Sequence, residues 1–133
     1  MIQAGHEIRP LRIDPVKASW MRDWAEILQD PNEIHLDADL VRRLGLGHEV
    51  INQGPLNISY VINAAMQEFP GATVERFAVR LLGNVYAGDC VTAYGKVAEV
   101  EEISTGTRLT CDMGLAVEGR TDALSVTLTL RLN

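Results

Sequence analysis

The stretch QDPNEIHLD, residues 29–37, gathers acidic and amide side chains around a single histidine. Asp30 and His35 are residue types that often hold a water molecule and move its protons. Their spacing lets them share one water if the loop folds the two side chains together. General acid–base help of this kind accelerates a reaction by about 10²–10⁴. The stretch is therefore a candidate catalytic centre.

Two plainer interpretations of the same stretch remain open. In the first, it is a helix-capping loop in which Asp30 and Asn32 satisfy backbone donors and Asp37 caps the next helix. We expect Asp37 to act only as a cap. In the second, Glu33 and the other carboxylates join His35 as metal ligands, because these are ligand types. No second histidine lies at a known ligand spacing, so we expect no metal site.

A helix is expected directly before this stretch. The preceding segment DPVKASWMRDWAEILQ carries an apolar residue at every fourth position: Val16, Trp20, Trp24 and Leu28. Such spacing places them on one helical face. Asp14 is a good N-cap, and Pro15 suits the first helical position. The helix should end near Gln29, because Pro31 disfavours helical geometry at Asp30.

Two further helices are expected downstream. The segment DADLVRRLG indicates a short helix that Gly45 closes. The segment PLNISYVINAAMQEF begins with Pro55 and is apolar on nearly all sides, which is typical of a buried helix that PG at 70–71 ends. Upstream, EIRPLRI at 7–13 is expected to form a short edge strand, because Pro10 cannot donate to a strand ladder.

After residue 71 the apolar pattern changes to a period of two. The alternating residues form four runs: Phe77, Val79 and Leu81; Val91, Ala93 and Val97; Leu109, Cys111, Met113, Leu115 and Val117; and Leu124, Val126, Leu128, Leu130 and Leu132. Each run is typical of an antiparallel strand with one buried face. Helices followed by strands indicate a single α+β domain over residues 1–133, in which the sheet curls around the buried helix.

Composition narrows the classes of function. The chain has 133 residues and a formal net charge of −6, so a broad nucleic-acid surface is not expected. Its two cysteines, Cys90 and Cys111, form neither a disulfide framework nor a metal-binding spacing. Neither a signal-peptide pattern nor a run of about 20 apolar residues is present. We therefore expect a cytoplasmic location and no membrane partner.

The motifs resemble those of a known family. DPNEIHLD, followed at residues 52–60 by NQGPLNISY, is similar to the MaoC-like hydratase/dehydratase group of hotdog-fold proteins, which includes the (R)-specific enoyl-CoA hydratases. That family's D-x-N-P-x-H-x-D segment is matched in register by Asp30, Asn32, His35 and Asp37. Gly54 matches the glycine that opens the family's buried helix. The later segment RLLGNVYAGDCVTAYGKV resembles its strand–turn–strand, and the likeness spans roughly residues 20–132.

The sequence departs from the family pattern at three positions. Glu33 stands where the family usually has proline, and Asn84 stands where proline is frequent. Gln53 replaces the common histidine before the glycine, which changes the shape of the expected thioester pocket. None of these departures removes the aspartate or the histidine.

The resemblance implies a hotdog fold and a hydratase or dehydratase of fatty acid metabolism. Such an enzyme interconverts trans-2-enoyl and (R)-3-hydroxyacyl thioesters of coenzyme A or a carrier protein. By the same resemblance, Asp30 and His35 are the catalytic pair and Asn32 orients them. The backbone N–H of Gly54, at a helix N-terminus, is the expected oxyanion donor. No metal or redox cofactor is required.

Three further residues are candidates for substrate binding: Gln53, Asn57 and Arg80. Gln53 would shape the thioester pocket, and Asn57 would line the acyl or pantetheine channel. Arg80 shares a strand face with Arg76 and would meet the phosphates of coenzyme A. The plainer alternatives, which we favour, are a core amide at Asn57 and a solvated sheet face at the arginines.

The resemblance also implies assembly and two alternative functions. Open strand edges of hotdog proteins pair across a two-fold axis, which implies a homodimer, a higher homo-oligomer or a heteromer with another hotdog chain. One alternative is a catalytically silent subunit of a heteromeric hydratase, although such a chain would usually lack the aspartate or the histidine. The other is an acyl-CoA thioesterase, which usually carries its carboxylate on the buried helix. That helix has only Glu68 here, near its far end.

Overall fold

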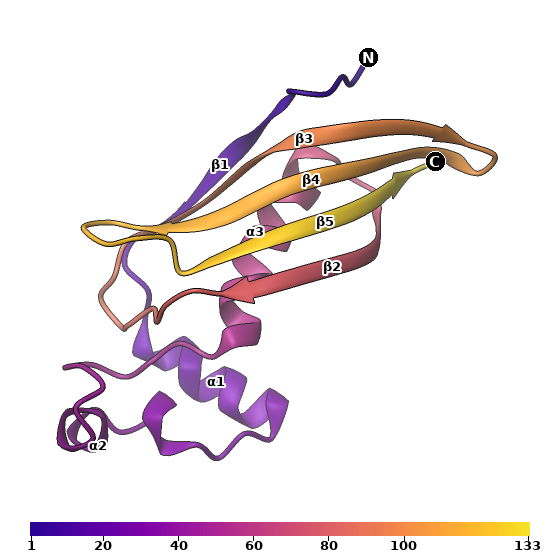
Figure 1. Ribbon diagram of the computed structural model, residues 1–133. Helices are drawn as coiled ribbons and strands as arrows, with labels where there is room; N and C mark the ends of the chain where they lie inside the picture. Colours follow the sequence, from indigo (N-terminus) through magenta and orange to yellow (C-terminus); the bar gives the residue numbers. More distant parts are fainter.

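The computed structural model describes residues 1–133 and contains a five-stranded antiparallel sheet, with helices on one side of it and at one end (Figure 1). In chain order the elements are β1 (Glu7–Ile13), α1 (Ala18–Leu28), the 3-10 helix η1 (Glu33–His35), α2 (Ala38–Arg43), α3 (Gly54–Glu68), β2 (Thr73–Leu81), β3 (Val91–Ile103), β4 (Gly106–Val117) and β5 (Leu124–Leu132). The strands lie in the order β1-β3-β4-β5-β2. This arrangement confirms the predicted α+β class.

The long helix α3 runs across one face of the curved sheet (Figure 1), as its apolar composition predicts. It packs against β1, β3 and β4. Its residues Val61, Ala64 and Ala65 are fully buried and belong to the same core as the inward-facing Leu124 and Leu128 of β5. No helix of the chain is both long enough and apolar enough to cross a membrane.

The edge strand β1 shows how a proline is accommodated in the sheet. The pairing of β1 with β3 shifts its register between Ile8 and Leu11, which makes a bulge at Pro10. A proline cannot donate to the ladder, and a bulge at a sheet edge leaves that position unpaired. The start of this strand is also fastened to the end of α3, because His6 Nε2 lies 2.9 Å from Glu68 Oε1. The predicted edge strand is confirmed.

The strand β2 forms the opposite edge of the sheet, and its inward face is largely uncovered. Phe77, Val79 and Leu81 pair with buried residues of β5 and therefore point to the side that carries α3. Even so, Phe77 is 48% exposed and Leu81 is 67% exposed. The predicted buried face is wrong for this strand within a single chain, because α3 lies over β1, β3 and β4 and leaves this edge open.

The helix α1 begins later than the sequence pattern predicts. It starts at Ala18, so Asp14 and Pro15 lie outside it and neither caps nor opens the helix. Val16 instead pairs with the turn at 88–89. Its N–H donates to Asp89 O at 2.9 Å, and its C=O accepts from the Gly88 N–H at 2.8 Å. These two hydrogen bonds hold Val16 against the turn, so the helix begins only at Ala18. The predicted C-terminal end of the helix is confirmed.

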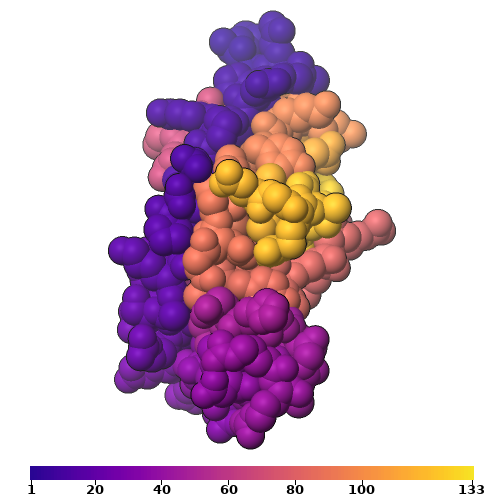
Figure 2. All heavy atoms as spheres, turned by 90° about the vertical axis from the view of Figure 1, so that its left-hand side faces the viewer, coloured from indigo at the N-terminus to yellow at the C-terminus, as the bar shows by residue number.

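The segment between α1 and α3 forms a lobe at the bottom of the molecule (Figure 2). It carries η1 and α2. Asp37 caps α2 as predicted, because its Oδ1 accepts from the N–H groups of Asp39 and Leu40 at 3.0 and 3.2 Å. Tyr86 fastens the lobe to the body of the molecule by donating its hydroxyl to Leu46 O at 2.5 Å. The candidate catalytic stretch lies in this lobe.

Replacing the fully buried Leu128 of β5 by alanine should lower the free energy of unfolding by about 2–5 kcal/mol, because the truncation leaves a cavity in the core. The neighbouring Thr127 faces outward and is the matched control. Thr127→Ala should cost less than about 1 kcal/mol. Urea denaturation measures both variants, and equal losses would contradict the assignment of the two faces of β5.

Candidate functional site

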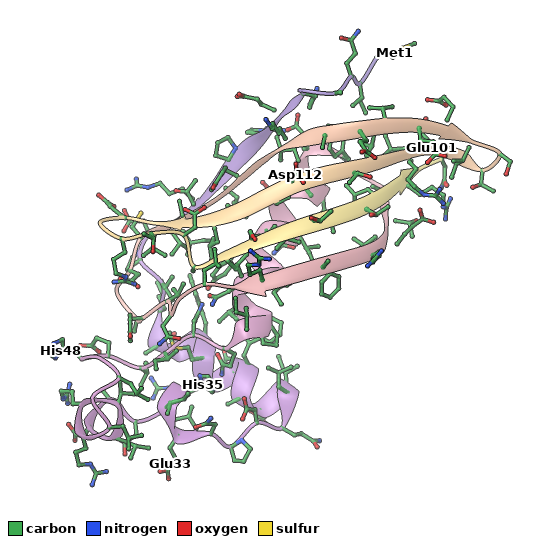
Figure 3. All side chains as sticks on the ribbon, in the orientation of Figure 1. Met1, Glu33, His35, His48, Glu101 and Asp112 are labelled. Atoms are coloured by element: carbon green, nitrogen blue, oxygen red, sulfur yellow. The ribbon has the colours of Figure 1, made fainter.

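Asp30 and His35 face each other in the lobe at the bottom of the molecule. After the last residue of α1, Gln29 adopts the left-handed region with a φ of 51°, which turns the chain out of the helix. The N–H of Asp30 then donates to Ala25 O at 2.9 Å. His35 ends η1, and its Nε2 lies 3.5 Å from Asp30 Oδ2. In Figure 3, His35 lies beside α1 and below the N-terminal end of α3.

The His35 ring is held by the backbone of the segment that leads into α3. Its Nδ1 lies 2.6 Å from the carbonyl oxygen of Ile51. A carbonyl oxygen can only accept, so in the neutral ring Nδ1 carries the proton and Nε2 presents a lone pair to Asp30. The His35 side chain is 10% exposed and that of Asp30 is 37% exposed. Solvent and ligands therefore reach the pair from the aspartate side.

The gap between the two side chains suits a bridging water. A separation of 3.5 Å is longer than a direct N–H···O hydrogen bond, which spans about 2.7–3.2 Å. His35 Nε2 and Asp30 Oδ2 are both acceptors when the ring is neutral and the carboxyl group is ionised. A water molecule placed against both can donate one hydrogen to each, which leaves its oxygen lone pairs free. The arrangement can therefore orient a water molecule and take a proton from it.

Asn32 holds the two members of the pair through its backbone. Its N–H donates to Asp30 Oδ1 at 3.1 Å, and its C=O accepts from the N–H of His35 at 3.2 Å. The side-chain Oδ1 of Asn32 caps η1 by accepting from the Ile34 N–H at 3.2 Å. Because Oδ1 of the aspartate is bound in this way, its Oδ2 is free to face the histidine. Capping and the positioning of the acid–base pair are thus compatible interpretations of the same stretch.

The first turn of α3 leaves one backbone N–H without a partner. Pro55 has no N–H to offer. The N–H groups of the next two residues, Leu56 and Asn57, both donate to Gln53 O, at 3.1 and 3.2 Å. The Gly54 N–H remains unpaired, at the positive end of the helix dipole. Gly54 is half-buried, and a Cβ built on it would meet no atom within 4 Å, so a ligand can approach this residue closely.

Two backbone contacts bring the segment before Gly54 to the histidine. The N–H of Ile51 donates to Ile34 O at 2.9 Å, and the C=O of Ile51 accepts from the His35 ring. Ile51 therefore pairs with η1 through both of its backbone groups, three residues before Gly54. The structure thus places the acid–base pair beside the segment that opens α3.

The three predicted substrate-binding residues occupy different surroundings. Gln53 is 1% exposed, and its Nε2 donates to Met21 O at 2.7 Å, which ties the start of α3 to α1. Asn57 is 5% exposed and lies in the first turn of α3. Arg80 is exposed on β2, on the sheet face opposite α3, so the structure does not bring it to the acid–base pair.

The other carboxylates of the stretch do not converge on His35. Asp37 Oδ1 is occupied in capping α2, and Glu33 lies at the bottom of the lobe, away from the histidine (Figure 3). No group of three or more histidine, cysteine, aspartate or glutamate side chains lies close enough together to hold a metal ion. The titratable side chains that meet at this site are therefore Asp30 and His35.

Sequence reasoning missed a buried polar group next to Gly54. Asn52 is 3% exposed, and its Nδ2 donates to Asn57 Oδ1 at 2.9 Å and to Tyr60 Oη at 3.2 Å. Burial raises the pKa of the Tyr60 hydroxyl above its ordinary value. A signal was present in the sequence, because two consecutive amides, Asn52 and Gln53, directly precede a largely apolar helix.

The acid–base pair opens to the surface of the single chain. None of the five main cavities is lined by Asp30, His35 or Gly54. The largest, of about 640 Å³, is a groove between α1 and α3 whose walls include Trp24 and Tyr60. The pair therefore lies outside the five main cavities of the single chain.

Comparison with known proteins gives matches in structure but not in sequence. No family model and no curated protein matches the chain. The (R)-hydratase from A. caviae involved in PHA biosynthesis matches with a TM-score of 0.89 and 21% identity, over 99% of this chain and 98% of that chain. The ChsH1-ChsH2 complex from Mycobacterium tuberculosis matches with a TM-score of 0.85 and 19% identity, over 100% of both chains. The MaoC-like dehydratase from Rhodospirillum rubrum matches with a TM-score of 0.82 and 16% identity, over 99% of this chain and 95% of that chain.

These comparisons establish the fold. The chain has the hotdog fold that MaoC-like dehydratases and (R)-hydratases share, and the correspondence runs over nearly its whole length. The resemblance predicted from DPNEIHLD and NQGPLNISY is thereby confirmed as a resemblance of fold.

The neutral His35 ring should carry its proton on Nδ1, because the Ile51 carbonyl can only accept. Nuclear magnetic resonance of the ring nitrogens distinguishes the two tautomers. His48 is exposed and its ring makes no hydrogen bond within the chain, so it serves as an internal control. A neutral His35 ring with its proton on Nε2 would contradict the proposed water-binding geometry.

Proposed function

We propose that this protein is a hydro-lyase that interconverts trans-2-enoyl and (R)-3-hydroxyacyl thioesters of coenzyme A or a carrier protein. The observation that carries this proposal is the 3.5 Å separation of His35 Nε2 and Asp30 Oδ2, which one water molecule can bridge. The second support is the unpaired N–H of Gly54, at the end of the segment that holds the histidine ring. Hydration of an enoyl thioester needs both an activated water and a donor to the thioester oxygen.

In the hydration direction, the water held by the pair adds its oxygen to the β-carbon of the double bond. One proton of the water passes to the pair as the carbon–oxygen bond forms. The electrons of the double bond move onto the thioester oxygen and give an enolate. The enolate then takes a proton at its α-carbon from the pair, which restores the starting protonation state. Dehydration of the 3-hydroxyacyl thioester follows the same steps in reverse.

The N–H of Gly54 stabilises the enolate oxygen in this scheme. A preorganised donor of this kind contributes about 3–4 kcal/mol in known enzymes, because it is already aimed at the charge that develops. The dipole of α3 acts in the same direction. The donor belongs to the backbone at the start of a buried helix, so no side chain has to reorder when the charge forms.

A catalytically silent role in a heteromer is the second candidate function. One matching structure is a complex of two components, ChsH1 and ChsH2. Against this role stands the retention of both Asp30 and His35, whose side chains face each other 3.5 Å apart. A chain that only completes another subunit's tunnel would not need that pair.

A thioesterase is disfavoured by the surroundings of Glu68, the one carboxylate on α3. Its Oε1 lies 2.9 Å from His6 Nε2, and its Oε2 accepts from the Arg9 N–H at 3.2 Å. The hydrogen bond to His6, followed by that from Arg9, lowers the pKa of the Glu68 carboxyl. A carboxylate engaged in this way, at the opposite end of the helix from Gly54, is not placed to attack a thioester bound at that glycine.

We also propose that a second copy of the chain covers β2. This nine-residue strand has no neighbour on its outer side, and its inward-facing Phe77 and Leu81 are exposed. Pairing with a second strand satisfies the free backbone groups and buries these side chains. It also adds walls on the open side of α3, where the single chain supplies no tunnel.

Purified protein should hydrate crotonyl-CoA or a longer enoyl-CoA, measured as the loss of enoyl absorbance. Asp30→Asn and His35→Ala should each lower kcat by about 10²–10⁴, because each removes one partner of the bridging water. Asp37→Asn is the matched control in the same stretch, since asparagine also caps helices, and it should keep full activity. A wild-type chain inert on every enoyl thioester would favour the silent role. Full activity of both site variants would place the chemistry elsewhere.

Charged substitutions on the inward face of β2 should break the assembly. Phe77→Lys and Leu81→Lys should each shift a dimer to a monomer in sedimentation velocity, because they bury a cation in the apolar contact. Thr127→Lys, on the outer face of β5, is the matched control and should leave the dimer intact. A monomeric wild-type chain would contradict self-pairing and leave a different hotdog chain as the partner.

A further inference from the structure

The buried side-chain amide of Asn52 donates to two polar side chains near the start of α3. The Nδ2 of Asn52 donates to Asn57 Oδ1 at 2.9 Å and to Tyr60 Oη at 3.2 Å. The three residues are 3%, 5% and 5% exposed. No other protein group accepts from or donates to the Asn57 side chain. Since its oxygen is taken, Asn57 has only its Nδ2 hydrogens left to offer.

The reverse orientation of the two amides is less favourable. Turning both would let Asn52 Oδ1 accept from Asn57 and from Tyr60. The Nδ2 of Asn52 would then occupy the place of the oxygen, where the chain offers no partner and no access to solvent. In folded proteins, a buried N–H group without an acceptor is rarer than a buried C=O group without a donor. The observed orientation, with Asn57 as an outward donor, is therefore the preferred one.

The donor lies at the N-terminal end of the helix. Asn57 follows Gly54 by three residues, so the two share one face of α3. Helical side chains lean towards the N-terminus, which brings the Asn57 amide over the first turn. Its contact with Asn52, two residues before Gly54, fixes it there. The Asn57 side chain and the unpaired Gly54 N–H therefore both belong to the first turn of α3.

This network is poorly explained by folding alone. The Oδ1 of Asn52 and the Oε1 of Gln53 are both sealed from solvent and have no hydrogen-bond partner in the chain. Buried polar atoms are normally paired, and a partly satisfied polar network is less stable than an apolar core. Apolar side chains at positions 52 and 53 would pack without these orphaned atoms. The amides are therefore held at this place at a cost in stability.

We infer that the Asn57 side-chain amide is a second hydrogen-bond donor to the thioester oxygen, beside the Gly54 N–H, and that Asn52 is the positioning residue that holds it in the donor orientation. The inference rests on the proposed hydratase function and deepens it. Two donors on one oxygen stabilise the enolate more than one, and the second donor explains why amides stand at the head of an apolar helix.

Steady-state kinetics on the best enoyl-CoA substrate tests the role of Asn57. Asn57→Leu and Asn57→Asp should each lower kcat about 100-fold with little change in KM, because the donor acts on the charge that develops in the transition state. Gln67→Leu makes a similar amide-to-leucine change at an exposed position of α3 that lines none of the five main cavities, and it should leave kcat unchanged. Thermal denaturation confirms that each variant is folded. Retention of wild-type kcat by folded Asn57→Leu or Asn57→Asp would overturn the inference while leaving the hydratase proposal standing.

The role of Asn52 is tested by coupling. In Asn52→Asp the new carboxylate can only accept, so the Asn57 amide turns its Nδ2 inward and presents its oxygen to the substrate. Asn52→Asp should therefore lose as much kcat as Asn57→Leu, and the double variant should lose no more than either alone. Additive losses would show that Asn52 does not act through Asn57.

Binding gives a readout that does not depend on turnover. Butyryl-CoA carries a thioester C=O where its thioether analogue S-butyl-CoA carries a CH₂ group. Calorimetry should show that the wild type binds the thioester about 10-fold more tightly, and that Asn57→Leu reduces this preference. If the wild type hydrates nothing but keeps the preference, the hydratase proposal fails and the donor assignment stands. If the wild type shows no preference, the donor assignment fails whether or not the protein is a hydratase.

Discussion

The hydrogen bond from His35 Nδ1 to the Ile51 carbonyl is the contact on which the rest of the site depends. It joins the lobe that carries η1 to the segment that enters α3, and it decides which ring nitrogen faces Asp30. Because Ile51 also donates its N–H to η1, one residue aligns the imidazole with the helix start at Gly54. The Asp30–His35 pair and the unpaired Gly54 N–H are therefore parts of one backbone frame.

Sequence patterns predicted the features that are determined by residues close together in the sequence. Alternating leucines and valines make β5 a one-faced strand, and Pro10 marks an edge because it cannot donate to a ladder. Pro31 ends α1 and delivers Asp30 to the loop, where the histidine of the same short stretch can reach it. Asp37 caps α2 because a short acceptor side chain at that place satisfies two free N–H groups.

The remaining features depend on contacts between segments that are distant in the sequence. The start of α1 is set by the bonds of Val16 to the turn at 88–89, which no local pattern reports. The exposure of β2 depends on where α3 crosses the sheet, which the alternation of its apolar residues does not report. Asn57 and Tyr60 are only five and eight residues from Asn52, yet two amides before an apolar helix do not by themselves specify which side chains they meet.

The open edge of β2 has a consequence for the life of the chain in a cell. Free N–H and C=O groups beside exposed apolar side chains are a template for unwanted strand addition and for fibrillar aggregation. Arg76 and Arg80 on the outer face carry the kind of charge with which natural edges resist this. While this edge is unpaired the two arginines protect it only in part, so aggregation of the chain should increase with its concentration.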